Sequence, residues 1–188
     1  MHKDLENLRK ELDAVITDVR SAFSDLTREQ INWKPSVEVW SVGQCFEHLN
    51  VGGAAMLKAI EGKVDYASNT TFFERLPILP GLFGKLVSNA VSPDAVRKLK
   101  SLKIFAPAGS SVDADVIAKF LDLQPSIASA MARCENVDTI MTSPVARFVT
   151  YSLLDGFRIV VWHERRHLAQ AKRVMENAAF PQTTKEGV

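Results

Sequence analysis

The segment VVWHERRHLAQ carries two histidines, His163 and His167, four positions apart. With Glu164 they match the H-E-x-x-H pattern of zinc peptidases, in which both imidazoles bind zinc and the glutamate is the general base. A peptidase also needs a third ligand downstream, and only Glu176 on the same predicted helix and Glu186 near the C-terminus follow. No strand pattern lies nearby to line a substrate cleft. The sequence therefore argues against a zinc peptidase, and Glu164 is interpreted as a solvent-facing residue.

A third histidine, His48, lies on the inward stripe of another predicted helix, whereas His2 falls in a terminal tail. His163 and His167 are one helical turn apart, so their rings emerge from the same face. Burying three imidazoles is unfavourable unless each finds a partner. Three neutral imidazoles with an open fourth position form the kind of site that holds catalytic zinc. Two interpretations stay open: a metal site formed by His48, His163 and His167, or three histidines that are individually hydrogen-bonded or half exposed.

Several side chains near the histidines are candidates for supporting roles. Gln44 and Gln170 lie on the histidine faces, where an amide could orient an imidazole or hold a metal-bound ligand. Gln44 also completes an S-x-x-Q capping box with Ser41, which is an equally good explanation for it. Arg166 could bind an anionic substrate group, although a surface salt bridge is the simpler interpretation. No residue is assigned as catalytic.

Small and apolar residues surround His48 along its helix. Gly52 and Gly53, followed by two alanines, leave space beside it. Glycine is an unfavourable residue inside a helix, so either a substrate pocket or close helix packing must explain the pair. Cys45, one turn before His48, is interpreted as a small hydrophobe rather than a nucleophile. Trp40 and Trp162 flank the histidines and are assigned to core packing.

Apolar residues recurring at three- and four-residue steps predict four long helices. They cover residues 5–23, 41–62, 113–134, and 152 to a point before Pro181. Residues 63–111 are interrupted by proline and glycine and predict only short helical pieces, at Phe72–Val87 and Pro93–Leu102. No alternating pattern predicts a strand. The sequence therefore predicts an all-α fold, a four-helix bundle with a long crossover between helices 2 and 3.

Composition excludes several classes of protein. The chain has 188 residues, of which 46% are hydrophobic, and a formal net charge of +1. This predicts a single domain over residues 1–188 and gives no general attraction to nucleic acid or to anionic membranes. A basic group in Arg97–Lys103 is interpreted as a solvated helix face. The charged N-terminal segment leads us to expect no signal peptide, and no apolar run is long enough to span a membrane. The two cysteines predict no disulfide framework. We expect a cytoplasmic protein.

Three segments resemble those of one known family. WSVGQCFEHLNVGG resembles the second-helix motif of the DinB/YfiT-like metalloenzyme superfamily, VVWHERRHLAQAKRV resembles its fourth-helix motif H-x-x-x-H-x-x-Q, and INWKP resembles the linker before the tryptophan. The resemblance implies a four-helix bundle with a long crossover. It also implies a divalent metal ion, zinc or nickel, held by His48, His163 and His167.

The resemblance further implies a small-molecule substrate. Members of the family include thiol-dependent S-transferases and hydrolases, so a low-molecular-weight thiol is a candidate cosubstrate. The metal could acidify a bound water for hydrolysis or bind a thiol as thiolate for transfer. The alternative function is a non-catalytic, metal- or ligand-binding bundle of a stress response. The family's habit and the apolar segment LPILPGLF make a homodimer plausible.

Overall fold

A computed structural model describes residues 2–65, 71–75, 79–91, 109 and 111–182. Most of this part is helical, as predicted. The four long helices are α1 (Lys3–Ala22), α3 (Val42–Val64), α5 (Val116–Arg133) and α6 (Leu153–Met175). Shorter elements are α2 (Arg28–Asn32), the 3₁₀ helix η1 (Phe73–Arg75) and α4 (Leu79–Val91). The predicted helical piece at Pro93–Leu102 lies outside the described residues.

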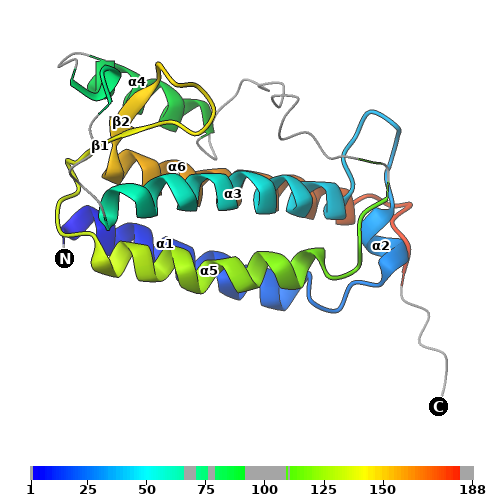
Figure 1. The fold of residues 1–188 in the computed structure, drawn as a ribbon. Coiled ribbons are helices and arrows are strands. Elements are labelled where there is room, and N and C mark those ends of the chain that lie inside the picture. Colours follow the sequence, from blue (N-terminus) through cyan, green and yellow to red (C-terminus); the bar gives the residue numbers. More distant parts are fainter. Residues whose placement is uncertain (1, 66–70, 76–78, 92–108, 110, 183–188) are drawn as a thin grey trace.

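The long helices pack side by side in two layers (Figure 1). α1 and α3 each contact both α5 and α6. Figure 1 also shows that α3 and α5 run in the same direction, opposite to α1 and α6. Because α5 begins at the end of the molecule where α3 begins, the chain between them must return along the whole length. This explains why the connection over residues 65–115 is so long, and α4 within it packs against α6.

The described part of the chain contains one short hairpin, for which the sequence shows no alternating pattern. Strand β1 (Ile140–Thr142) pairs antiparallel with β2 (Thr150–Ser152), and Met141 lies opposite Tyr151 in the ladder. Both of these side chains are buried in the core. Each strand has only three residues, which is too short to show the alternation by which strands are recognised. The hairpin leads directly into α6, whose N-cap is Ser152.

The capping box predicted at the start of the second long helix is confirmed. The Ser41 hydroxyl accepts a hydrogen bond from the Gln44 backbone N–H at 3.1 Å, and Gln44 Oε1 accepts one from the Ser41 N–H at 3.1 Å. Both residues are buried. This reciprocal cap satisfies two amide groups that a helix start otherwise leaves unpaired. It fixes where α3 begins and therefore which face of α3 carries His48.

Buried apolar residues form two clusters, one toward each end of the long helices. On α6 the first cluster reaches Val161 and the second starts at Leu168. On α3 the corresponding gap lies between Leu49 and Met56. Since α3 packs against α6, polar side chains can be placed in this gap without interrupting either apolar cluster.

None of the described helices combines the length and the apolarity that crossing a membrane requires.

Gly43 is held in a close approach between α3 and its neighbours, which gives a first prediction. A Cβ there would stand 2.7 Å from Ile31 Cγ2, 3.1 Å from the Ile31 carbonyl oxygen and 3.2 Å from Val112 Cβ. We expect Gly43→Ala to lower the free energy of unfolding by about 1–3 kcal/mol, because overpacking against a backbone oxygen outweighs the helix propensity of alanine. Urea denaturation measures the change.

The matched control is Gly62→Ala on the same helix. Gly62 is exposed, and no described atom would lie within 4 Å of its Cβ. This variant should be as stable as the wild type or slightly more stable. Equal stability of Gly43→Ala and wild type would show that α2 moves away without loss.

Candidate metal centre

Three histidine rings from two helices meet in the gap between the apolar clusters. His48 comes from α3, and His163 and His167 come from successive turns of α6. The centroid of the His48 ring lies 4.8 Å from that of His163 and 4.6 Å from that of His167. The centroids of the two α6 rings are 4.6 Å apart. One donor nitrogen of each residue lies within 4.8 Å of the others. The structure therefore brings together all three predicted ligands.

The spacing of these nitrogens is close to that of a shared ion. His48 Nε2 and His163 Nε2 are 3.0 Å apart. Two nitrogens bound to a tetrahedral zinc ion at ~2.0–2.1 Å stand about 3.3 Å from each other. This pair of nitrogens is therefore already near the spacing that a shared cation requires, and the third donor lies within 4.8 Å of both. The group could hold a metal ion.

Burial favours the neutral form of the two α6 imidazoles. Burial lowers the pKa of His163 well below its usual value, and the positive potential of the His167, His48 and Arg166 side chains lowers it further. The pKa of His167 falls to about 3, mainly through burial and the neighbouring His48, while the Gln170 amide opposes the shift. Neutral imidazole is the form that binds metals, so little proton release would accompany binding.

The chemistry of the donor set also fits a cation. His48 is buried and the other two histidines are half-buried. Nδ1 of His167 is enclosed by the fold and has no hydrogen-bond partner. A buried polar atom without a partner is unfavourable, and an orienting hydrogen bond or a coordinated ion at this ring would remove that penalty. Three nitrogen donors on rigid helices are typical of a zinc site with an open position.

Trp40 forms one wall of the histidine group. Its ring stacks on His167, with centroids 5.8 Å apart and an interplanar angle of 20°, and it tilts against His48 at 5.1 Å. It also packs against the neighbouring apolar cluster, as predicted. The position of Trp40 directly before the N-cap Ser41 means that the cap of α3 also sets this wall.

The interpretation of Glu164 as a solvent-facing residue is wrong. Its side chain is only 2% exposed, and Gln124 Nε2 on α5 donates a hydrogen bond to its Oε1 at 3.2 Å. Burial raises the pKa of this carboxyl to about 8. Because α6 contacts α1, α3 and α4, it is covered on several sides, and a residue next to an inward histidine can still be buried. The carboxyl is engaged by α5, which differs from the role of the glutamate in a peptidase.

The other sequence candidates are placed as follows. The Gln44 amide is used at both ends, since its Oε1 serves the capping box and its Nε2 donates to the Gly109 carbonyl at 2.7 Å. Gln170 lies beside the His167 ring. Cys45 is buried, and burial raises the pKa of its thiol to about 12, so no thiolate forms at neutral pH. This agrees with the interpretation of Cys45 as a small hydrophobe.

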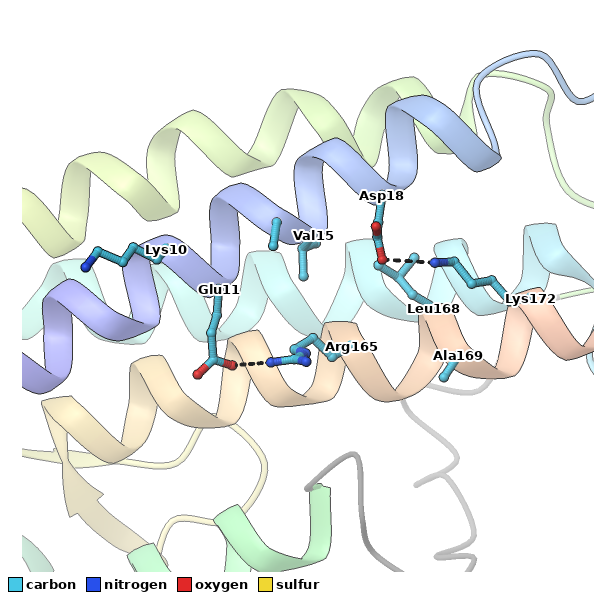
Figure 2. A pocket seen from close by; sticks show the side chains of 9 residues that line it. Lys10, Glu11, Val15, Asp18, Arg165, Leu168, Ala169 and Lys172 are labelled. Atoms are coloured by element: carbon cyan, nitrogen blue, oxygen red, sulfur yellow. Dashed lines mark hydrogen bonds and ion pairs between the residues drawn. The ribbon is translucent and has the colours of Figure 1, made fainter.

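A groove of about 420 Å³ runs between α1 and α6 (Figure 2). Two ion pairs join charged residues across it: Arg165 binds Glu11 at 2.7 Å and Lys172 binds Asp18 at 2.9 Å. Such exposed pairs contribute only ~0–1 kcal/mol each. None of the three histidines lines this groove, so it is separate from the candidate centre.

Comparison with known proteins points to one family. A family model described as the DinB superfamily matches residues 11–171, a range that includes all three histidines. The uncharacterized protein YuaE of Bacillus subtilis (strain 168) is 26% identical over 154 residues, which cover 80% of this chain and 86% of that protein. No solved structure matches the chain significantly.

Proposed function

Because the chain belongs to the DinB superfamily, we propose that it is a divalent-metal-dependent enzyme whose ion is held by His48, His163 and His167. The observation that carries this proposal is the convergence of three imidazoles from two helices, with donor nitrogens within 4.8 Å of one another. The expected ion is zinc or nickel. The expected reaction is S-transfer with a low-molecular-weight thiol, or hydrolysis, on a small molecule.

The donor set determines what the ion could do. Bound there, a divalent cation would act as a Lewis acid that lowers the pKa of a water or thiol in the remaining position. All three donors are imidazoles, so no protein carboxylate among them would reduce the positive charge at the site. Gln170 is proposed to orient His167 from the side. Gln44 is proposed to act indirectly, by fixing the start of α3 and with it the position of His48.

The described side chains near the histidines favour a nucleophile from solution. Cys45 remains a thiol at neutral pH because burial raises its pKa to about 12. The Glu164 carboxyl is engaged by Gln124 on α5. Neither residue is therefore suited to covalent attack or to serve as the general base. An external water or thiol is consistent with both proposed reactions.

The experiment that tests this proposal is elemental analysis followed by turnover assays. We expect about one zinc or nickel ion per chain in protein purified without chelators, as a three-histidine site predicts. Thiols paired with epoxides, alkyl halides or activated alkenes, and a separate panel of esters and amides, should show consumption that EDTA abolishes and the metal restores. Protein without stoichiometric metal would refute the proposal. Metal without turnover would favour the non-catalytic, stress-response alternative.

A homodimer and a cytoplasmic location remain predictions. The segment LPILPGLF proposed for a dimer contact lies partly outside the described residues. Sedimentation of the purified chain measures the oligomeric state directly.

A further inference from the structure

Two adjacent glycines on α3 have different surroundings. A Cβ on Gly53 would stand 2.9 Å from Leu123 Cδ2, so the end of this leucine would have to move, and the close packing of α5 against α3 favours glycine there. A Cβ on Gly52 would meet one described atom within 4 Å, the His163 Cε1 at 3.9 Å, which is an ordinary contact distance. Of the two explanations that the sequence leaves open, helix packing therefore accounts for Gly53 and not for Gly52.

Gly52 lies on the same face of α3 as His48, one turn further along. Trp40 covers the rings of His48 and His167 on their side of the group. Beside His163, by contrast, the surface of α3 presents a residue without a side chain. Among the described residues, Trp40 thus covers one side of the histidine group, whereas only the backbone of Gly52 borders it beside His163.

The charge at the group indicates which ligands this border would admit. The three donors are imidazoles, which bring no negative charge. Of the carboxyls next to them in sequence, Glu164 is engaged by Gln124, and Glu47 has one enclosed oxygen without a hydrogen-bond partner. Arg166 lies between the two α6 histidines in sequence and is half-buried, so it brings a positive charge to this part of α6. A divalent ion there would keep most of its charge. Such a site attracts anions more strongly than neutral molecules.

We propose that Gly52 keeps open the approach of a small anionic ligand to the histidine site, between α3 and α6 and beside His163. The inference rests on the proposed metal site. Glycine is the poorest helix former after proline, and an alanine methyl at this position would fit at normal contact distance. The fold therefore gains nothing from the glycine, and a position where stability is given up in this way is typical of a functional constraint.

The test uses the full chain loaded with Co²⁺, whose visible absorption changes when azide binds the ion. Gly52→Ala and Gly52→Val add one and three carbon atoms beside His163. We expect the Kd for azide to rise about threefold in Gly52→Ala and at least tenfold in Gly52→Val, because the larger side chain obstructs the approach more. The Co²⁺ content should remain that of the wild type.

Gly62→Ala and Gly62→Val are the matched controls, because they make the same changes at an exposed position of the same helix. Their azide affinity should stay within about twofold of the wild type, which is a negligible free-energy change. Gly52→Ala should nevertheless raise the melting temperature by about 2–4 °C. Higher stability with weaker azide binding in one variant is a result that general damage to the fold does not produce.

Four results would overturn the inference. The first is unchanged azide affinity in Gly52→Val that still holds Co²⁺. The second is an equal loss in the Gly62 variants, and the third is a Co²⁺-loaded wild type that binds no azide. If Gly52→Val loses Co²⁺, its azide affinity cannot be measured, and unchanged azide affinity in Gly52→Ala then overturns the inference. A wild-type chain that takes up no Co²⁺ is the fourth, and it refutes the metal site itself together with this inference.

Discussion

Replacing His163 with alanine is expected to abolish tight metal binding. His163 is in contact with both other rings, and its Nε2 lies 3.0 Å from that of His48. Its loss leaves two donors on different helices. The affinity should fall more than ~100-fold, because removing only a neighbour that hydrogen-bonds to a ligand already costs 10–100-fold.

Two measurements check this expectation. Elemental analysis after dialysis should find the ion in the wild type and not in His163→Ala. Added zinc or nickel should raise the melting temperature of the wild type alone, because an ion at ~100 times its Kd stabilises the folded state by about 2.7 kcal/mol. Retention of the ion and of the same melting shift by the variant would contradict the three-histidine site.

Glu164→Gln is the matched control within the same motif. Its amide is nearly isosteric with the protonated carboxyl that Gln124 binds, and it makes the change next to His163 without removing a donor. This variant should retain the ion. His2→Ala removes a histidine that only caps α1, so it should also bind metal normally.

The second large effect is expected at Glu74 in η1. Its side chain is fully buried and accepts hydrogen bonds from Lys63 Nζ at 2.8 Å, the Thr71 N–H at 2.7 Å and the Thr142 hydroxyl at 2.8 Å. It therefore links the end of α3 to η1 and to β1. Glu74→Ala should lower the free energy of unfolding by ~3–5 kcal/mol, since it breaks a buried ion pair by removing one partner. Urea denaturation at neutral pH measures this loss.

The same network predicts the pH dependence. Burial alone would raise the pKa of Glu74, but the hydrogen bonds from Lys63, Thr71 and Thr142 and the charge of Lys63 outweigh it and lower the pKa below its usual 4.5. The folded state thus holds the carboxylate more strongly than the unfolded state does. The stabilisation is fully present above about pH 4.5 and is lost as the pH falls through the folded-state pKa.

Glu74→Gln isolates this charge at nearly constant shape. Its stability deficit relative to wild type should be constant from about pH 6 to 8 and should shrink below about pH 4.5. The exposed Glu38→Gln serves as control and should show neither effect. A deficit that persists unchanged in acid would mean that the carboxylate charge is not what holds η1.

The features that could be predicted from sequence depend on neighbours along the chain. Leu5, Leu8 and Leu12 repeat with the period of a helix and are buried on α1. Ser41 and Gln44 are three residues apart, which is the spacing that a capping box needs. The meeting of His48 with the α6 histidines is not a local property. It was expected because both segments resemble motifs of one family.

What could not be predicted depends on contacts between distant segments. Glu164 is buried because Gln124, 40 positions away, provides its hydrogen bond. Gln44 is engaged by Gly109, 65 positions away. The difference between Gly52 and Gly53 depends on Leu123 of another helix. A helical wheel assigns one inward face to each helix, whereas α6 packs against α1, α3 and α4 and is joined to α5 through Glu164 and Gln124, so it is covered on more than one side.

His48 and His163 are separated by 115 positions, so an ion bound to both would join the two halves of the chain. An ion bound to both would close a loop of that length and reduce the entropy of the unfolded chain, much as a disulfide does. If the chain were produced as two fragments divided within residues 65–115, one fragment would carry His48 and the other His163 and His167. Their reassembly into one molecule should depend on the cation, and a chelator should release one half from the other.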